Sequence, residues 1–204
     1  TCWRGRGCSC SSAGERQLAA TIPRRPERAS LHRGIATALG QRRTDAVGQA
    51  GRAGELGFNL DLAGDIEEAF TGLLAGADVA GAIAPAAAFS HLERACELWD
   101  AAGASTGAAN RGHRLWQAAD IATSTVGNER AVQLARAAFE RGLPPLGAAW
   151  GHERLGRYLG STGRREESRS EFGRAAALLS GHVGTEAAAV YAGLGQAELM
   201  AGQD

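Results

Sequence analysis

The sequence predicts an all-α protein, a solenoid of about eight or nine helices stacked as hairpins. Hydrophobic residues make up 44% of the chain but aromatic residues only 5%. The abundant alanine suits closely packed helices better than a β-sandwich. Apolar residues recur every three or four positions, and no segment alternates as a half-buried strand does. A pattern of Leu-Gly, six residues and a second Gly also returns along the chain.

The N-terminal segment, residues 1–23, is expected to be disordered or weakly helical, ahead of a repeat domain at 24–204 that is truncated at its C-terminal end. Cys2, Cys8 and Cys10 cluster in the polar stretch "TCWRGRGCSC". A zinc site would need a second Cys or His pair at ligand spacing, so we interpret these residues as incidental thiols. Residues 15–22, "ERQLAATI", are compatible with a short helix that ends before Pro23.

The first helices of the repeat domain are marked by proline, glycine and apolar spacing. Pro26 suits a first helical turn, where its missing N–H costs nothing. The apolar residues of that helix fall on one face: Leu31, Ile35 and Leu39. A second helix is expected over 45–62 and ends at Gly64. Asp65 is expected to cap the next helix through its carboxylate.

Pro85 separates that helix from another, which is expected over 86–103. Four apolar residues of this helix form one stripe: Ala88, Leu92, Ala95 and Trp99. Cys96 is expected to be a small core residue. Ser105 is a candidate cap for the following helix. In the helix that begins near Asn128, three apolar residues share a face: Val132, Ala135 and Phe139. Pro144 and Pro145 mark a turn before the last three helices.

The Leu-Gly pattern occurs at Leu56, Leu155 and Leu194, and Gly127 lies in a looser copy with a one-residue shift. An acidic or polar first turn, a small residue and an aromatic residue follow the first two copies. A mid-helix glycine costs roughly 1 kcal/mol relative to alanine, so we expect close approach of an antiparallel partner helix. The structural signature residues are Leu56, Gly57, Gly64, Ala69, Leu155, Gly156, Gly163, Phe172, Ala175, Leu194, Gly195 and Gly202.

Catalytic, metal-binding and cofactor-binding motifs are not found in the sequence, so we expect no enzyme. All 22 basic residues are arginine, which rules out a P-loop lysine or a Schiff base. The pairs Glu67-Glu68 and Glu166-Glu167 fall in first helical turns, where negative charge suits the helix dipole. The five histidines are scattered and are interpreted as surface or half-buried residues: His32, His91, His113, His152 and His182.

Electrostatics and hydropathy argue against nucleic acid and membrane as partners. The 22 basic residues balance 22 acidic ones. Asp78 and Pro85 interrupt the longest weakly polar tract, and no signal peptide is recognised, so we expect a cytoplasmic protein. Most aromatic residues are assigned to packing between repeats, with a ligand groove as the alternative: Phe89, Trp99, Trp116, Phe139, Trp150, Tyr158 and Phe172. The arginines are assigned to solvated faces: Arg111, Arg114, Arg154, Arg157, Arg164 and Arg165.

The segment from Leu155 through Gly163, Ser168 and Phe172 to Ala175 resembles the tetratricopeptide repeat. The copies are degenerate, because Leu155 and Leu194 lie 39 residues apart rather than 34. The order of segments over residues 24–203 is also similar to the helical middle region of large bacterial LuxR-type regulators. "HLERACELWD" (91–100) and "HERLGRYLGSTGR" (152–164) are the most specific phrases. Gly57 and Asn59 stand where that family often has bulky aromatic residues or His.

The LuxR resemblance implies a sensing and scaffolding region between an ATPase and a DNA-binding helix-turn-helix, neither of which this chain contains. Its expected partners are another protein, other parts of the parent regulator, or a small effector. Self-association is expected through Leu194, Leu199 and Met200. The alternative is a free-standing tetratricopeptide-like adaptor that binds a peptide or protein.

Overall fold

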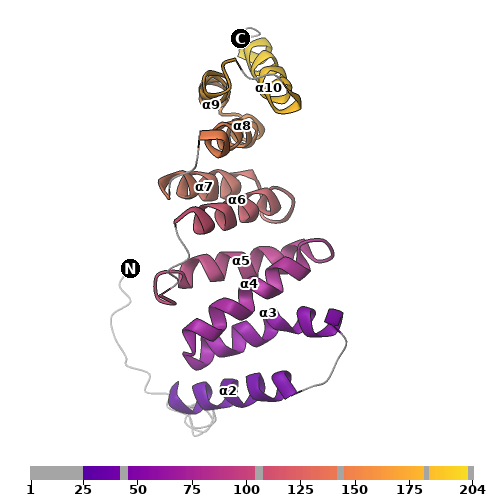
Figure 1. The fold of residues 1–204 in the computed structure, drawn as a ribbon, viewed down its shortest axis with the longest axis vertical. Coiled ribbons are helices and arrows are strands. Elements are labelled where there is room, and N and C mark those ends of the chain that lie inside the picture. The colour runs from indigo at the N-terminus through magenta and orange to yellow at the C-terminus, as the bar shows by residue number, and fades with distance from the viewer. Residues whose placement is uncertain (1–24, 42–45, 104–107, 142–144, 182–183, 202–204) are drawn as a thin grey trace, which may run out of the picture.

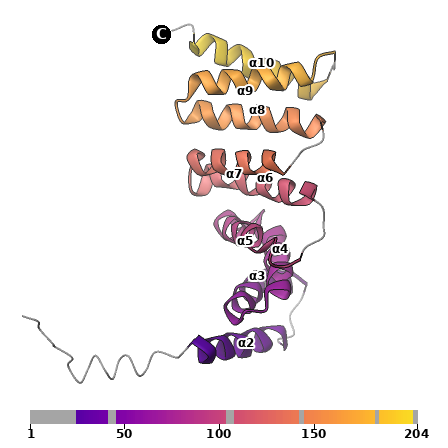
Figure 2. The same ribbon diagram turned by 90° about the vertical axis from the view of Figure 1, so that its left-hand side faces the viewer.

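The computed structural model describes residues 25–41, 46–103, 108–141, 145–181 and 184–201. These residues form nine α-helices and no strand. The helices stack along one axis, with α2 at one end and α10 at the other (Figure 1, Figure 2). This confirms the predicted all-α solenoid-like fold. The helices are α2 Arg25–Gln41, α3 Ala46–Ala63, α4 Ile66–Ala80, α5 Pro85–Leu98, α6 Ala108–Thr125, α7 Asn128–Glu140, α8 Pro145–Ser161, α9 Arg165–Leu178 and α10 Thr185–Ala201.

Three helix pairs, α3/α4, α6/α7 and α8/α9, form the tightest hairpins, and α5 lies between α4 and α6. Each hairpin turns at a glycine with positive φ, +89° at Gly64, +109° at Gly127 and +79° at Gly163. The second helix begins two residues after Gly64 and Gly163 but directly after Gly127. This shorter turn is the physical origin of the one-residue shift in the looser copy.

Mid-helix glycines mark the places where paired helices cross most closely. A Cβ built on Gly57 of α3 would lie 2.6 Å from the backbone nitrogen of Leu73 in α4. A Cβ on Gly156 of α8 would lie 3.0 Å from the ring of Phe172 in α9. Gly195 differs from the expected pattern, because nothing lies within 4 Å of the position of its Cβ. In α10 the close approach falls at Gly193, whose Cβ would lie 2.3 Å from Phe172.

The hydrophobic core runs along the stack and consists largely of alanine with a few large side chains. Its central cluster joins α4 to α8 and includes Leu92, Val132 and Leu159, which are almost fully buried. The predicted stripe on α5 is confirmed, since Ala88, Leu92, Ala95 and Trp99 are all buried, as is Cys96. Small side chains let helices approach closely while still excluding water.

The apolar residues of α2 differ in burial: Leu31 is 57% exposed and Ile35 39%, Leu39 is half-buried, and Ala36 is the buried residue of that helix. Two expectations about charged side chains are wrong. Asp65 precedes α4 but makes no side-chain capping bond. Its carboxylate instead accepts hydrogen bonds from Arg33, at 2.8 Å from Nε and 2.7 Å from Nη2. Arg111 is not solvated, because its side chain is 13% exposed and donates to the Cys96 carbonyl at 2.9 Å.

Several expectations fall outside the described residues: the N-terminal segment with its three cysteines, the cap at Ser105, His182 and Gly202. Among the described helices, none is both long enough and apolar enough to span a bilayer.

Candidate binding face

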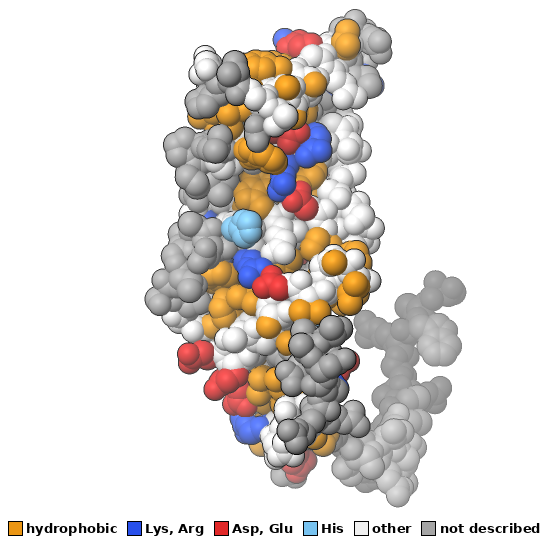
Figure 3. Space-filling model, turned by 45° about the vertical axis from the view of Figure 1, so that its right-hand side comes forward, with side chains coloured by type: hydrophobic (Ala, Val, Ile, Leu, Met, Phe, Trp, Pro, Cys, Tyr) orange, Lys and Arg blue, Asp and Glu red, His pale blue; other side chains and the backbone are white. Residues whose placement is uncertain are grey.

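One exposed edge of the stack brings polar, charged and aromatic side chains from α4, α6 and α8 together. On α6 and on α8 these residues recur every three or four positions, which places each set on one side of its helix. Figure 3 shows one face of the molecule, with hydrophobic side chains interrupted by neighbouring blue and red ones and by a histidine. We call this edge the binding face and define it by Asp78, His113, Arg114, Gln117, Asp120, Trp150, Arg154 and Arg157.

Ion pairs connect the residues of the binding face between alternate helices, α4 with α6 and α6 with α8. Arg114 of α6 forms a bidentate pair with Asp78 of α4 and also donates to Gln117 at 3.0 Å. Arg154 of α8 donates to Asp120 of α6 at 2.6 Å. The partners in these pairs lie 36 and 34 residues apart, close to the length of one repeat. The pairs therefore link corresponding positions of neighbouring units.

Asp120 also accepts a hydrogen bond from the buried hydroxyl of Tyr158, at 2.5 Å. Burial raises the pKa of Tyr158, and the hydrogen bond to Asp120 raises it further. Tyr158 therefore remains a neutral donor under ordinary conditions. With Arg154 and Tyr158 as its donors, Asp120 orients the middle of α8 relative to α6.

Trp150 is the large aromatic residue exposed on the binding face. It belongs to the set of aromatic residues most of which were assigned to packing between repeats, and the residue is 42% exposed. The guanidinium carbon of Arg154 lies 5.5 Å from the centroid of its ring, a cation–π arrangement. Since Asp120 anchors Arg154, the exposed Trp150 is held in place from one side. A large ring that is partly exposed and already oriented has little rotamer freedom to lose on binding.

A pocket of about 500 Å³ opens beside the binding face between α4, α5 and α6. Phe70, Leu74 and Trp99 form its apolar wall, and Arg114 and Asp78 lie at its rim. The rings of Phe70 and Trp99 meet edge to face, with centroids 5.0 Å apart. The pocket thus combines an apolar wall with a charged rim.

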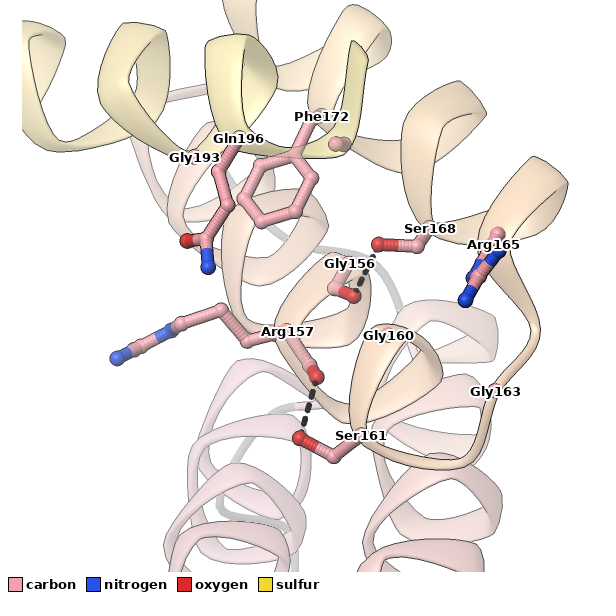
Figure 4. A pocket seen from close by; sticks show the side chains of 11 residues that line it. Gly156, Arg157, Gly160, Ser161, Gly163, Arg165, Ser168, Phe172, Gly193 and Gln196 are labelled. Atoms are coloured by element: carbon pink, nitrogen blue, oxygen red, sulfur yellow. Dashed lines mark hydrogen bonds between the residues drawn. The ribbon is translucent and has the colours of Figure 1, made fainter. Parts of the chain in front are cut away.

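A second pocket, of about 610 Å³, lies between α8, α9 and α10 (Figure 4). Phe172 lies inside it, and Ser168 donates to the carbonyl of Gly156 at 2.7 Å. Arg157 and Gln196 lie on one side of the pocket, and Arg165 on the other (Figure 4). The lining includes two arginines and no carboxylate. Arg157 lies one turn beyond Arg154 on α8, so this pocket continues the binding face.

A third pocket, of about 490 Å³, involves α7, α8 and α9. There His152 pairs with Glu171 at 2.6 Å and stacks on Phe139, with ring centroids 4.5 Å apart. Glu171 also accepts a hydrogen bond from Arg174 at 2.8 Å. The contacts of His152 join α8 to α9 and to α7, and the contact of Arg174 lies within α9. Within the described ranges, no group of three His, Cys, Asp or Glu side chains is placed to hold a metal ion.

Two other titratable side chains are buried in the core. His91 of α5 was interpreted as a surface or half-buried residue, but it is buried where α3 and α4 cross. A Cβ on Gly54 would lie 2.1 Å from its ring, so that glycine makes room for the imidazole. Burial lowers the pKa of His91, and the backbone of Gly76 opposes the shift. Burial raises the pKa of the Cys96 thiol to about 11.

Of the signature residues, Gly156, Gly163, Phe172 and Leu155 line pockets. Gly57 lies at the crossing of α3 and α4 and Gly64 at their turn, whereas Gly195 makes no close contact with another helix. The sequence did not identify Asp78 and Asp120 as functional candidates. The signal that could have found them is the spacing of about one repeat between each aspartate and its arginine.

No family model matches the chain, and no curated protein matches it. Among solved structures, the chain is similar to the crystal structure of BtubC (BKLC) from P. vanneervenii, with 12% sequence identity and a TM-score of 0.36. The match covers 85% of this chain and 65% of that chain. This chain therefore spans less than two thirds of the length of the structure it matches.

Proposed function

We propose that this chain is a binding module, not an enzyme, and that its binding face captures a segment of a partner protein. The observation that carries the proposal is the exposed Trp150, whose ring lies against the guanidinium of Arg154, which Asp120 anchors in turn. Tryptophan and arginine dominate the energetics of protein interfaces because they bury large areas and make directed polar contacts.

The partner segment carries an apolar side chain next to a carboxylate. The apolar side chain packs on Trp150 or in the pocket walled by Phe70 and Trp99. The carboxylate reaches the α8–α10 pocket, whose lining includes Arg157. Arg157 pairs with Glu153 at 2.9 Å, but its side chain remains well exposed and can also contact a ligand.

The larger setting of this module is the sensing and scaffolding region of a cytoplasmic LuxR-type ATP-binding transcriptional regulator. The similar phrases at 91–100 and 152–164, together with the stacked hairpins, support this proposal. A free-standing tetratricopeptide-like adaptor would use the same binding face. Sequencing the neighbouring coding DNA separates the two, because the regulator requires a P-loop coding region upstream and a helix-turn-helix downstream in the same reading frame.

Selection from a random peptide library displayed on phage tests the binding function directly. The wild-type chain is immobilised, and peptides are enriched on it without counter-selection against any variant. We expect a consensus that contains Leu, Phe or Trp beside Asp or Glu. Enriched peptides should bind the Arg174→Ala variant normally, because Arg174 is an exposed arginine outside the binding face. Failure to enrich any peptide, or a consensus of basic residues, would refute the proposal.

A further inference from the structure

A histidine lies at the point where three helices meet. His91 of α5 is 9% exposed, and its ring lies against the crossing of α3 and α4. A Cβ built on Gly54 of α3 would lie 2.3 Å from Nε2 of the ring, and one on Gly76 of α4 would lie 3.2 Å from Nδ1. The ring of Phe58 in α3 is also adjacent, with the two ring centroids 5.3 Å apart. We call these four residues the His91 junction.

The His91 junction is tightly packed around a polar ring. A Cβ on Gly76 would lie only 2.4 Å from Cα of Gly54, so the backbones of α3 and α4 are in contact here. Alanine at either position would therefore displace a helix or the imidazole. Nδ1 of His91 is buried and has no hydrogen-bond partner among the described residues. Buried polar atoms are usually hydrogen-bonded, so this site holds a polar ring in surroundings that suit an apolar one.

The charged side chains around the His91 junction do not compensate a charge on the imidazole. Asp61 of α3 and Arg94 of α5 lie on the sides of their helices that bear Gly54 and His91, but they bond to each other at 2.6 Å. On α4, the residues three, four and seven positions from Gly76 are all uncharged. The other charged residues of the three helices are Arg52 and Glu55 on α3, Glu67, Glu68 and Asp78 on α4, and Glu93 and Glu97 on α5. Of the described residues, no charged side chain contributes to the shifted pKa of His91.

Protonation of His91 would place an uncompensated charge at this crossing, which is costly. Burial lowers the pKa of His91 from its ordinary value of 6.5, so the unfolded chain takes up the proton more readily than the folded one. The contribution of neutral His91 to stability is therefore complete above pH 6.5 and is lost as the pH falls from there through the lowered pKa. Water reaches the charged imidazole only when α3, α4 and α5 separate.

The His91 junction adjoins the pocket of about 500 Å³ beside the binding face. Phe58 packs against the hydrophobic cluster that contains Phe70 and Trp99. These two rings form the pocket wall together with Leu74, which precedes Gly76 by two residues on α4. Separation of α3 from α4 and α5 would remove Phe58 from that cluster and loosen the wall.

We propose that His91 is an acid-sensitive switch built into the fold. With a neutral imidazole, it holds α3, α4 and α5 together and keeps the pocket wall in place. With a charged imidazole, it drives these helices apart, and the partner segment is released. The effect on binding rests on the proposed function, whereas the effect on helix packing does not.

The equilibrium constant of unfolding, from urea titrations at pH 7.5 and pH 5.5, tests the effect on packing. An imidazole with a pKa of 6.5 in the unfolded chain that stays neutral in the folded one raises this constant by up to about tenfold between these pH values. We expect the constant to rise at least about threefold more for the wild type than for His91→Leu, whose apolar side chain takes up no proton. His113→Gln is the matched control, because it removes an exposed histidine and should keep the wild-type response. Equal responses of the wild type and His91→Leu, or loss of the response in His113→Gln, would overturn the proposal.

Proton NMR of the wild type tests the switch without any substitution. The imidazole of His91 is identified by its proximity to the ring of Phe58 and is followed from pH 8 to pH 5. Its titration midpoint should lie below that of the exposed His113. As His91 titrates, amide exchange corrected for its intrinsic pH dependence should accelerate in α3, α4 and α5 but not in α8 and α9. A midpoint equal to that of His113, or equal acceleration in all helices, would refute the switch.

The affinity of a library-selected peptide separates the switch from the proposed function. Wild type and His91→Leu should bind alike at pH 7.5, and at pH 5.5 the Kd should rise at least about threefold more for the wild type. An equal pH dependence of Kd in the two proteins would overturn the coupling of His91 to the pocket. Failure to select any peptide would count against the proposed function alone, and the unfolding constants would still decide whether His91 is a switch.

Discussion

Replacing Gly57 by alanine in the middle of α3 should destabilise the protein, although alanine is the better helix former. The added Cβ would lie 2.6 Å from the backbone nitrogen of Leu73, 2.9 Å from its Cγ and 3.0 Å from the carbonyl oxygen of Ala69. Two of these atoms belong to the α4 backbone and cannot rotate away. Ordinary contacts between heavy atoms begin near about 3.5 Å, so α4 would have to move by about 1 Å.

Because two of the clashing atoms belong to the α4 backbone, the cost should lie in the upper part of the range for overpacking, about 2–3 kcal/mol, and the gain in helix propensity offsets about 1 kcal/mol. We therefore expect the free energy of unfolding to fall by about 1–2 kcal/mol. In a protein of this size, that corresponds to a decrease in Tm of about 2–8 °C. Circular dichroism during thermal unfolding, repeated in urea, measures both quantities.

The matched control is Gly173→Ala in α9, where nothing lies within 4 Å of the built Cβ. Here only the propensity gain remains, and the protein should become more stable by about 0.5–1 kcal/mol. Identical substitutions should thus have opposite signs. A Gly57→Ala protein with an unchanged or higher Tm would refute the interpretation of this glycine as a helix crossing.

Three further predictions concern buried side chains. Tyr158→Phe removes the hydrogen bond to Asp120 and should lower the free energy of unfolding by about 1–2 kcal/mol in urea titrations. Because the pKa of the Cys96 thiol is raised from 9.0 to about 11, the contribution of its neutral form to stability is complete below pH 9 and is lost as pH rises toward 11. With the N-terminal cysteines replaced by serine, the folded protein should resist thiol reagents at pH 8, and rapid labelling would contradict this. Leu92→Ala in the central cluster should cost about 2–5 kcal/mol, whereas Leu62→Ala at an exposed position should change stability by less than about 0.5 kcal/mol.

The all-α class, most helix boundaries and the hairpin turns could be predicted because their signals are local. The apolar stripe of α5 and the glycines at positions 64, 127 and 163 depend on residues a few positions apart. Backbone sterics and helical periodicity act over the same range. The repeated Leu-Gly motif predicted the stack of hairpins, because one helix pair cannot bury its apolar face alone and several pairs must therefore stack.

What the sequence could not determine depends on contacts between distant residues. The carboxylate of Asp65 was predicted to cap the helix that follows it. It instead accepts a hydrogen bond from Arg33, 32 residues away. The sequence of α2 shows which residues share a side, not which side meets α3, and in the structure Leu31 and Ile35 are exposed whereas Ala36 is buried. The binding face depends on the same long-range pairing, because Arg154 meets Asp120 only after α6 and α8 have stacked.

The affinity of a library-selected peptide for the wild-type chain and for Trp150→Ala, measured by isothermal titration calorimetry, tests the central claim most directly. Loss of a central interface tryptophan costs about 2 kcal/mol or more, so Kd should rise at least about 30-fold. Arg174→Ala should leave Kd within about twofold of the wild type. Equal Kd values for the wild type and Trp150→Ala would show that the partner does not bind this face, and would contradict the proposed function.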